Sequence, residues 1–128
     1  MPFWGLVVTS LGFAIPAAIA FKKARWITSA SCGVLTISSV AYHGTVHPLA
    51  LRVDMFVAHS LGVGWAFESL RRTVIIRRAE DAIISAMTLS GITIYGLKSR
   101  NNFTESSRWW HMAFHVLAQS AWCIYLLR

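Results

Sequence analysis

The chain has 128 residues, of which 55% are hydrophobic and only 13% are charged. Soluble domains carry about 25% charged residues, so this composition all but excludes a water-soluble monomer, and the length allows one domain. The net charge of +7 would suggest a nucleic-acid partner in a soluble chain. Here the basic residues lie between long apolar runs, which is typical of membrane flanks, and no nucleic-acid partner is expected.

The apolar runs predict five membrane-spanning helices, because a bilayer core requires about 20 apolar residues per helix. In chain order these helices cover residues 3–20, 27–43, 48–70, 82–97 and 109–127. Pro16 is expected to kink the first helix, Pro48 suits the first turn of the third, and Ser106 or Ser107 is the expected N-cap of the fifth. The predicted fold class is all-α, a polytopic membrane bundle forming a single transmembrane domain over residues 1–128.

The distribution of basic residues predicts the orientation in the membrane. Five spans place the termini on opposite sides, and eight of the 12 Lys and Arg residues then fall on the C-terminal side. They include Lys22, Lys23, Arg25 and the arginines of the segment 71–81. By the positive-inside rule the N-terminus faces outside and the C-terminus faces the cytoplasm or the mitochondrial matrix.

The N-terminal segment reads as an uncleaved anchor, because its basic residues follow the first span, whereas those of a signal peptide precede the apolar run. It resembles neither a signal peptide nor an Arg-rich presequence, so the endoplasmic reticulum and the mitochondrial inner membrane are both expected locations.

Polar residues inside the predicted spans are concentrated near the side that holds the N-terminus. Ser39 and His43 lie at positions i and i+4 near the end of the second span, and Asp54 lies in the first turns of the third. His111 and His115 lie at i and i+4 near the start of the fifth. Ionisable groups in membrane spans are costly and are functional candidates. We therefore expect one site at this bilayer depth.

The residue types predict a zinc site. Residues at i and i+4 share a helix face, so His111 and His115 can bind one ion together, with His43 as the third ligand. Three protein ligands and an open fourth position are typical of catalytic zinc. Asp54 would orient or deprotonate the bound water, and Ser39 would hold a substrate oxygen or support a ligand.

Two other interpretations of the histidines stay open. Each could simply form hydrogen bonds between helices, as polar residues in membrane spans often do. A haem held by His59 and His115 is the other interpretation. Otherwise His47, beside Pro48, and His59 are expected to be structural.

The constellation resembles the superfamily of seven-helix membrane proteins that contains alkaline ceramidases, adiponectin and progestin-type receptors, and GPI-lipid remodelling proteins. The shared pattern is Ser-x3-His ending the second helix, Asp opening the third and His-x3-His in the last. Here these motifs match Ser39 and His43, then Asp54, then His111 and His115. The resemblance implies a zinc ion on the three histidines and a water beside Asp54, in a shortened five-helix form of the fold.

The predicted function is therefore a zinc-dependent intramembrane hydrolase of lipid amide or ester bonds, with membrane lipids as substrates. The alternative is a non-catalytic accessory subunit of a larger membrane complex, for example a respiratory one, that retains the ceramidase-like fold and the histidine cluster. In both cases other membrane-protein subunits are expected partners.

Overall fold

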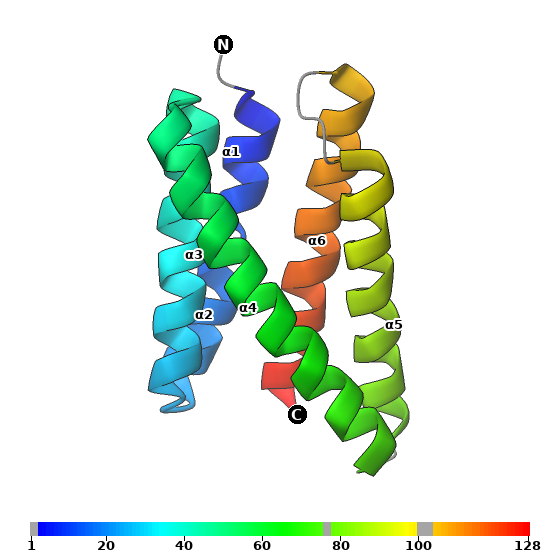
Figure 1. Ribbon diagram of the computed structural model, residues 1–128. Helices are drawn as coiled ribbons and strands as arrows, with labels where there is room; N and C mark the ends of the chain where they lie inside the picture. Colours follow the sequence, from blue (N-terminus) through cyan, green and yellow to red (C-terminus); the bar gives the residue numbers. More distant parts are fainter. Residues whose placement is uncertain (1–2, 76–77, 100–103) are drawn as a thin grey trace. The chain divides into compact units, whose positions relative to one another are not determined.

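A computed structural model describes residues 3–75, 78–99 and 104–128, and all regular elements in this part of the chain are helices (Figure 1). In chain order these are α1 (Trp4–Leu11), α2 (Ala14–Lys22), α3 (Trp26–Thr45), α4 (Pro48–Ile75), α5 (Ala79–Ile94), the π-helix η1 (Tyr95–Ser99) and α6 (Glu105–Leu127). The predicted all-α class is confirmed.

The first predicted helix is interrupted, so that it forms α1 and α2. The amides of Gly12 and Phe13 donate to the carbonyls three residues before them, at 3.2 and 3.1 Å, instead of four residues before. The cause is Pro16, which has no amide hydrogen to donate. In a regular α-helix its ring would also clash with the carbonyl of Gly12, four residues earlier. The kink expected at this proline is therefore present, and it takes the form of a break just before the residue.

The C-terminus of α4 and the N-terminus of α5 extend beyond the predicted bounds, and charged residues lie at both ends. Arg71 and Arg72 donate to the Glu68 carboxylate at 2.8 and 2.6 Å, and these i+3 and i+4 pairs continue α4 beyond Leu70. The acidic residues Glu80 and Asp81 occupy the first turn of α5. Negative charges at this position stabilise a helix, because they interact with the positive end of its dipole.

The expected N-cap of the last helix was wrong. Thr104 caps α6, and its hydroxyl accepts a hydrogen bond from the amide of Ser107 at 3.2 Å. Ser106 and Ser107 lie inside the first turn. Arg77, one of the basic residues used for the orientation, lies outside the described residues.

The chain forms two compact units, Met1–Gly62 and Val63–Arg128, and the boundary falls within α4. In the first unit α3 packs against both α1 and α2. Ser29 of α3 donates to the carbonyl of Ala17 at 2.9 Å, and the fully buried Ser10 of α1 contacts Ser39 of α3. Hydroxyl groups thus contribute to the packing of the three helices. The single domain over residues 1–128 stays a prediction.

The second unit has a core of aromatic and aliphatic side chains. Trp65 packs with the buried Ile84 and Ala121, and its ring stacks on Trp122 at a centroid distance of 4.0 Å. The indole nitrogen of Trp65 donates to the Thr88 hydroxyl at 3.0 Å, so the polar edge of the ring is satisfied inside the core. These contacts join the C-terminal part of α4 to α5 and α6.

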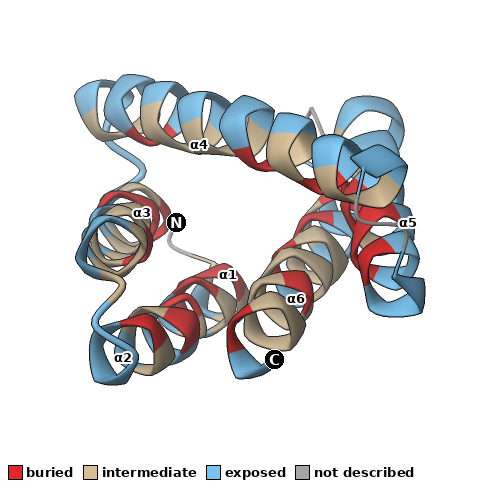
Figure 2. Cartoon of the chain, turned by 90° about the horizontal axis from the view of Figure 1, so that it is seen from below, coloured by how far each residue is buried: buried red, intermediate tan, exposed pale blue. Residues whose placement is uncertain are grey.

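Large apolar side chains are exposed on the helices of both units. Along α4, exposed residues follow one side of the helix (Figure 2), and Phe56 and Phe67 are 74% and 71% exposed. Extensive exposed apolar surface is typical of proteins that contact lipid or another protein.

Among the described residues, one stretch, Trp4–Lys22, is long and apolar enough to cross a membrane. A core helix of a soluble protein, or a signal sequence, would have the same properties. The polytopic arrangement therefore stays a prediction.

Candidate metal centre

His111 and His115 form a pair on one face of α6. Their ring centroids are 4.7 Å apart, with the ring planes at 88° to each other. Both residues are buried, with exposed fractions of 6% and 3%. The i, i+4 spacing on a capped helix therefore presents two imidazoles side by side, as the sequence predicts.

His43 lies in the last turn of α3 and is also buried. The helix ends two residues later, and Val46 follows in the left-handed conformation with φ of 54°. After this turn the chain enters α4 at Pro48. The first part of α4 brings Asp54 into contact with Ser38 of α3 within the same unit. His43 is thus within the last turn before the chain changes direction.

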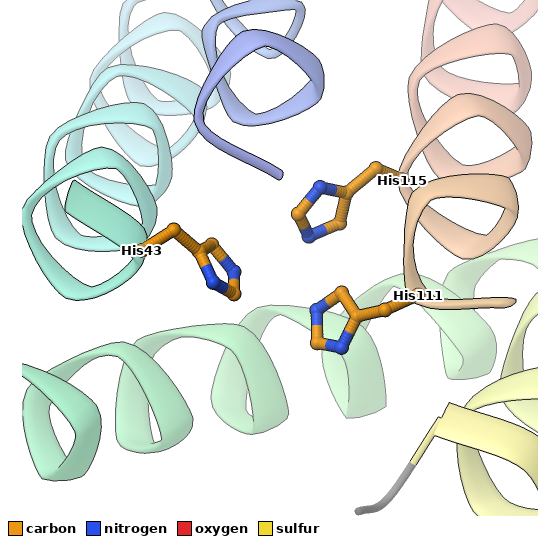
Figure 3. Close-up of side chains that lie close together, drawn as sticks. All are labelled: His43, His111 and His115. Atoms are coloured by element: carbon orange, nitrogen blue, oxygen red, sulfur yellow. The ribbon is translucent and has the colours of Figure 1, made fainter. Parts of the chain in front are cut away.

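The three predicted histidine ligands are distributed over both units, with His43 in the first and His111 and His115 in the second. Each is buried and offers one imidazole nitrogen, and together they form a group that could hold a metal ion (Figure 3). Zinc–nitrogen bonds are about 2.0–2.1 Å long, and imidazole is a common zinc ligand.

Asp54, the predicted water partner, is buried in the first unit and is bound by a serine that the sequence analysis did not identify. The hydroxyl of Ser38 donates to Oδ1 of Asp54 at 2.9 Å, and both residues are only 7% exposed. A buried carboxylate needs such donors, because its desolvation is otherwise very costly. Ser38 thus fixes one oxygen of Asp54 against α3.

Ser39, the predicted substrate or ligand support, is 2% exposed and contacts α1. The hydroxyl of Ser10 donates to the carbonyl of Leu6 in the same helix at 2.7 Å. It also donates to Oγ of Ser39 at the longer distance of 3.3 Å. The adjacent serines of α3 therefore contact different helices: Ser38 binds Asp54 of α4, and Ser39 binds Ser10 of α1.

The two remaining histidines are exposed, and each one forms a local hydrogen bond. The ring of His59 lies 2.6 Å from the carbonyl of Met55 in its own helix, and His47 Nδ1 accepts from the amide of Leu49 at 3.2 Å. The structural roles that the sequence analysis expected for both residues stay predictions.

Compared with family models, with curated proteins and with solved structures, the chain matches none of them. The resemblance to the ceramidase superfamily therefore depends on the motif residues alone.

Proposed function

We propose that the chain is a membrane-embedded, zinc-dependent hydrolase that cleaves an amide or ester bond of a lipid. The observation that carries the proposal is the pair of buried imidazoles of His111 and His115, whose ring centroids are 4.7 Å apart on one face of α6. Together with the buried His43 they form a group that could hold a metal ion. Three imidazoles leave a fourth position for water or substrate, which distinguishes catalytic from closed structural zinc sites.

The membrane setting is supported by the distribution of apolar side chains. The stretch Trp4–Lys22 satisfies the length and hydropathy of a membrane span, and large apolar residues are exposed on every α-helix from α1 to α6. In this proposal the N-terminus faces outside, and the membrane is that of the endoplasmic reticulum or the mitochondrial inner membrane. Lipids reach the site from the bilayer, and other membrane subunits cover part of the apolar surface.

The roles of the chain's residues follow from their chemistry. His43, His111 and His115 would hold the zinc ion, which when bound lowers the pKa of water to about 7 and polarises a carbonyl group. Asp54 accepts a proton from the attacking water, and Ser38 keeps its carboxylate oriented through Oδ1. Water oxygen bonds to the carbonyl carbon, the C–N or C–O bond breaks, and the proton leaves with the amine or alcohol.

The test uses protein purified in detergent with zinc added. A fluorescently labelled ceramide is the amide probe, and a fluorescently labelled phosphatidylcholine is the ester probe. We expect hydrolysis of at least one of them by the wild type and loss of this activity in Asp54→Asn, with the metal content unchanged. His59→Ala is the matched control, since it removes an exposed histidine of α4.

Two results would overturn the proposed chemistry. Normal turnover in Asp54→Asn would remove Asp54 from the reaction. A wild type that binds zinc but hydrolyses neither probe would contradict the hydrolase and would favour a structural metal site in an accessory subunit.

A further inference from the structure

The ring of His111 is in contact with two aromatic side chains of the second unit. Tyr95 meets it edge to face at a centroid distance of 5.8 Å and 76°, and Phe114 does so at 5.9 Å and 88°. Tyr95 and Phe114 also contact each other at 5.3 Å. Distances of 4.5–7 Å with perpendicular planes are the favourable geometry for aromatic pairs. We call Tyr95 and Phe114 the aromatic bracket.

The backbone changes its helical form where the bracket begins. Tyr95 is the first residue of η1, the π-helical turn that continues α5. π-turns are rare, and they are frequent at functional sites because the extra residue in the turn rotates side chains away from their α-helical directions. The change of helix type therefore coincides with the residue that contacts His111.

Gly91 provides the space for the other half of the bracket. A Cβ atom at this position would lie 3.4 Å from Cδ2 of the Phe114 ring. Gly91 and Tyr95 are four residues apart and share a helix face, so one face of α5 and η1 supplies both the space for Phe114 and the ring that contacts it. The bracket residues Tyr95 and Phe114 thus come from η1 and α6, and Gly91 of α5 leaves the space for the Phe114 ring.

We infer that the aromatic bracket positions His111 for metal binding, an inference that depends on the metal site of the proposed function. The χ2 angle of histidine is broad and roughly two-fold, so an unrestrained ring presents either nitrogen or neither. The two rings packed edge to face against the imidazole restrict this rotation before the ion arrives. Hydrogen-bonding residues that orient a metal ligand typically change metal affinity by about 10–100-fold when they are removed, and we expect the packed rings to act at the lower end of this range.

The experiment measures the affinity of the detergent-purified chain for Zn²⁺ and Co²⁺ by competition with a chromophoric chelator. We expect Tyr95→Ala to weaken binding by about tenfold, and Tyr95→Phe to bind like the wild type, because the ring edge and not the hydroxyl makes the contact. The matched control is Phe67→Ala, which removes an exposed aromatic ring from α4. Equal loss in Tyr95→Phe and Tyr95→Ala would overturn the inference, as would unchanged affinity in Tyr95→Ala.

A second pair of variants tests the bracket through Phe114 and keeps the inference open to refutation if Tyr95→Ala does not fold. Gly91→Ala places a Cβ at ordinary contact distance and should leave the affinity unchanged, whereas Gly91→Leu should displace the Phe114 ring and weaken binding. Unchanged affinity in a folded Gly91→Leu would contradict the bracket. Absence of metal binding by the wild type would instead refute the proposed function, so the two failures are distinguishable.

Discussion

Ser38 donates a 2.9 Å hydrogen bond to Oδ1 of Asp54, and both residues are only 7% exposed. The bond joins α3 to α4 within the first unit, so the orientation of the carboxylate depends on the packing of these two helices. A buried acceptor that loses its donor retains its desolvation cost, which is about 1–3 kcal/mol and greater for a charged group.

Removal of the Ser38 hydroxyl should therefore destabilise the protein. We expect Ser38→Ala to lower the free energy of unfolding by about 1–3 kcal/mol, and Ser38→Thr to retain most of it because the hydroxyl is preserved. Denaturation monitored by circular dichroism in detergent measures both changes. Ser60→Ala, an exposed serine of α4, is the control, and equal stabilities of Ser38→Ala and this control would contradict the role of the bond.

The ion pair of the second unit, which joins the buried Asp81 to the more exposed Arg128, gives an ordered prediction. Asp81 is 2% exposed, and its partner Arg128 has a side chain that is 20% exposed. Loss of one partner from a buried pair costs about 3–5 kcal/mol because a charge is left without compensation. We expect Arg128→Ala to destabilise more than Asp81→Ala, since the carboxylate that is left behind is the more deeply buried of the two groups.

The midpoints of chemical denaturation of these two variants test this order. Arg52→Ala, which removes an exposed arginine of α4, should shift the midpoint little. A larger effect for Asp81→Ala than for Arg128→Ala would contradict the assignment of the cost to the unpaired carboxylate.

Zinc should stabilise the folded protein. A ligand that binds only the folded state at about 100 times its dissociation constant adds about 2.7 kcal/mol to the stability. Thermal denaturation in detergent should therefore show a higher Tm with zinc than with a chelator, and re-addition of zinc should restore it. The difference should be absent in His43→Ala and retained in His59→Ala. An equal zinc response in His43→Ala would exclude His43 from the site.

The helical class and the pairing of His111 with His115 could be predicted from the sequence because both depend on local periodicity. The i, i+4 spacing places His111 and His115 on one face, and the missing amide hydrogen of Pro16 accounts for the break before α2. The predicted N-cap of α6 was wrong because several hydroxyl residues lie close together at the start of this helix. Only the backbone geometry shows that Thr104 is the one that accepts from Ser107.

The supporting residues could not be predicted, because they depend on how helices face one another. Ser38 and Ser39 are adjacent, so a small rotation of α3 decides which hydroxyl makes the direct 2.9 Å bond to Asp54. The contact of Tyr95 with His111 depends on a π-helical turn, which has no recognisable signal in hydropathy.

The metal content of the detergent-purified protein tests the central claim most directly, with the wild type measured beside His111→Ala. Under the proposed function we expect about one zinc ion per chain in the wild type, as for a three-histidine site, and its loss in the variant. The absence of bound metal from both proteins would contradict the account, and the three buried histidines would then be partners in ordinary hydrogen bonds between helices.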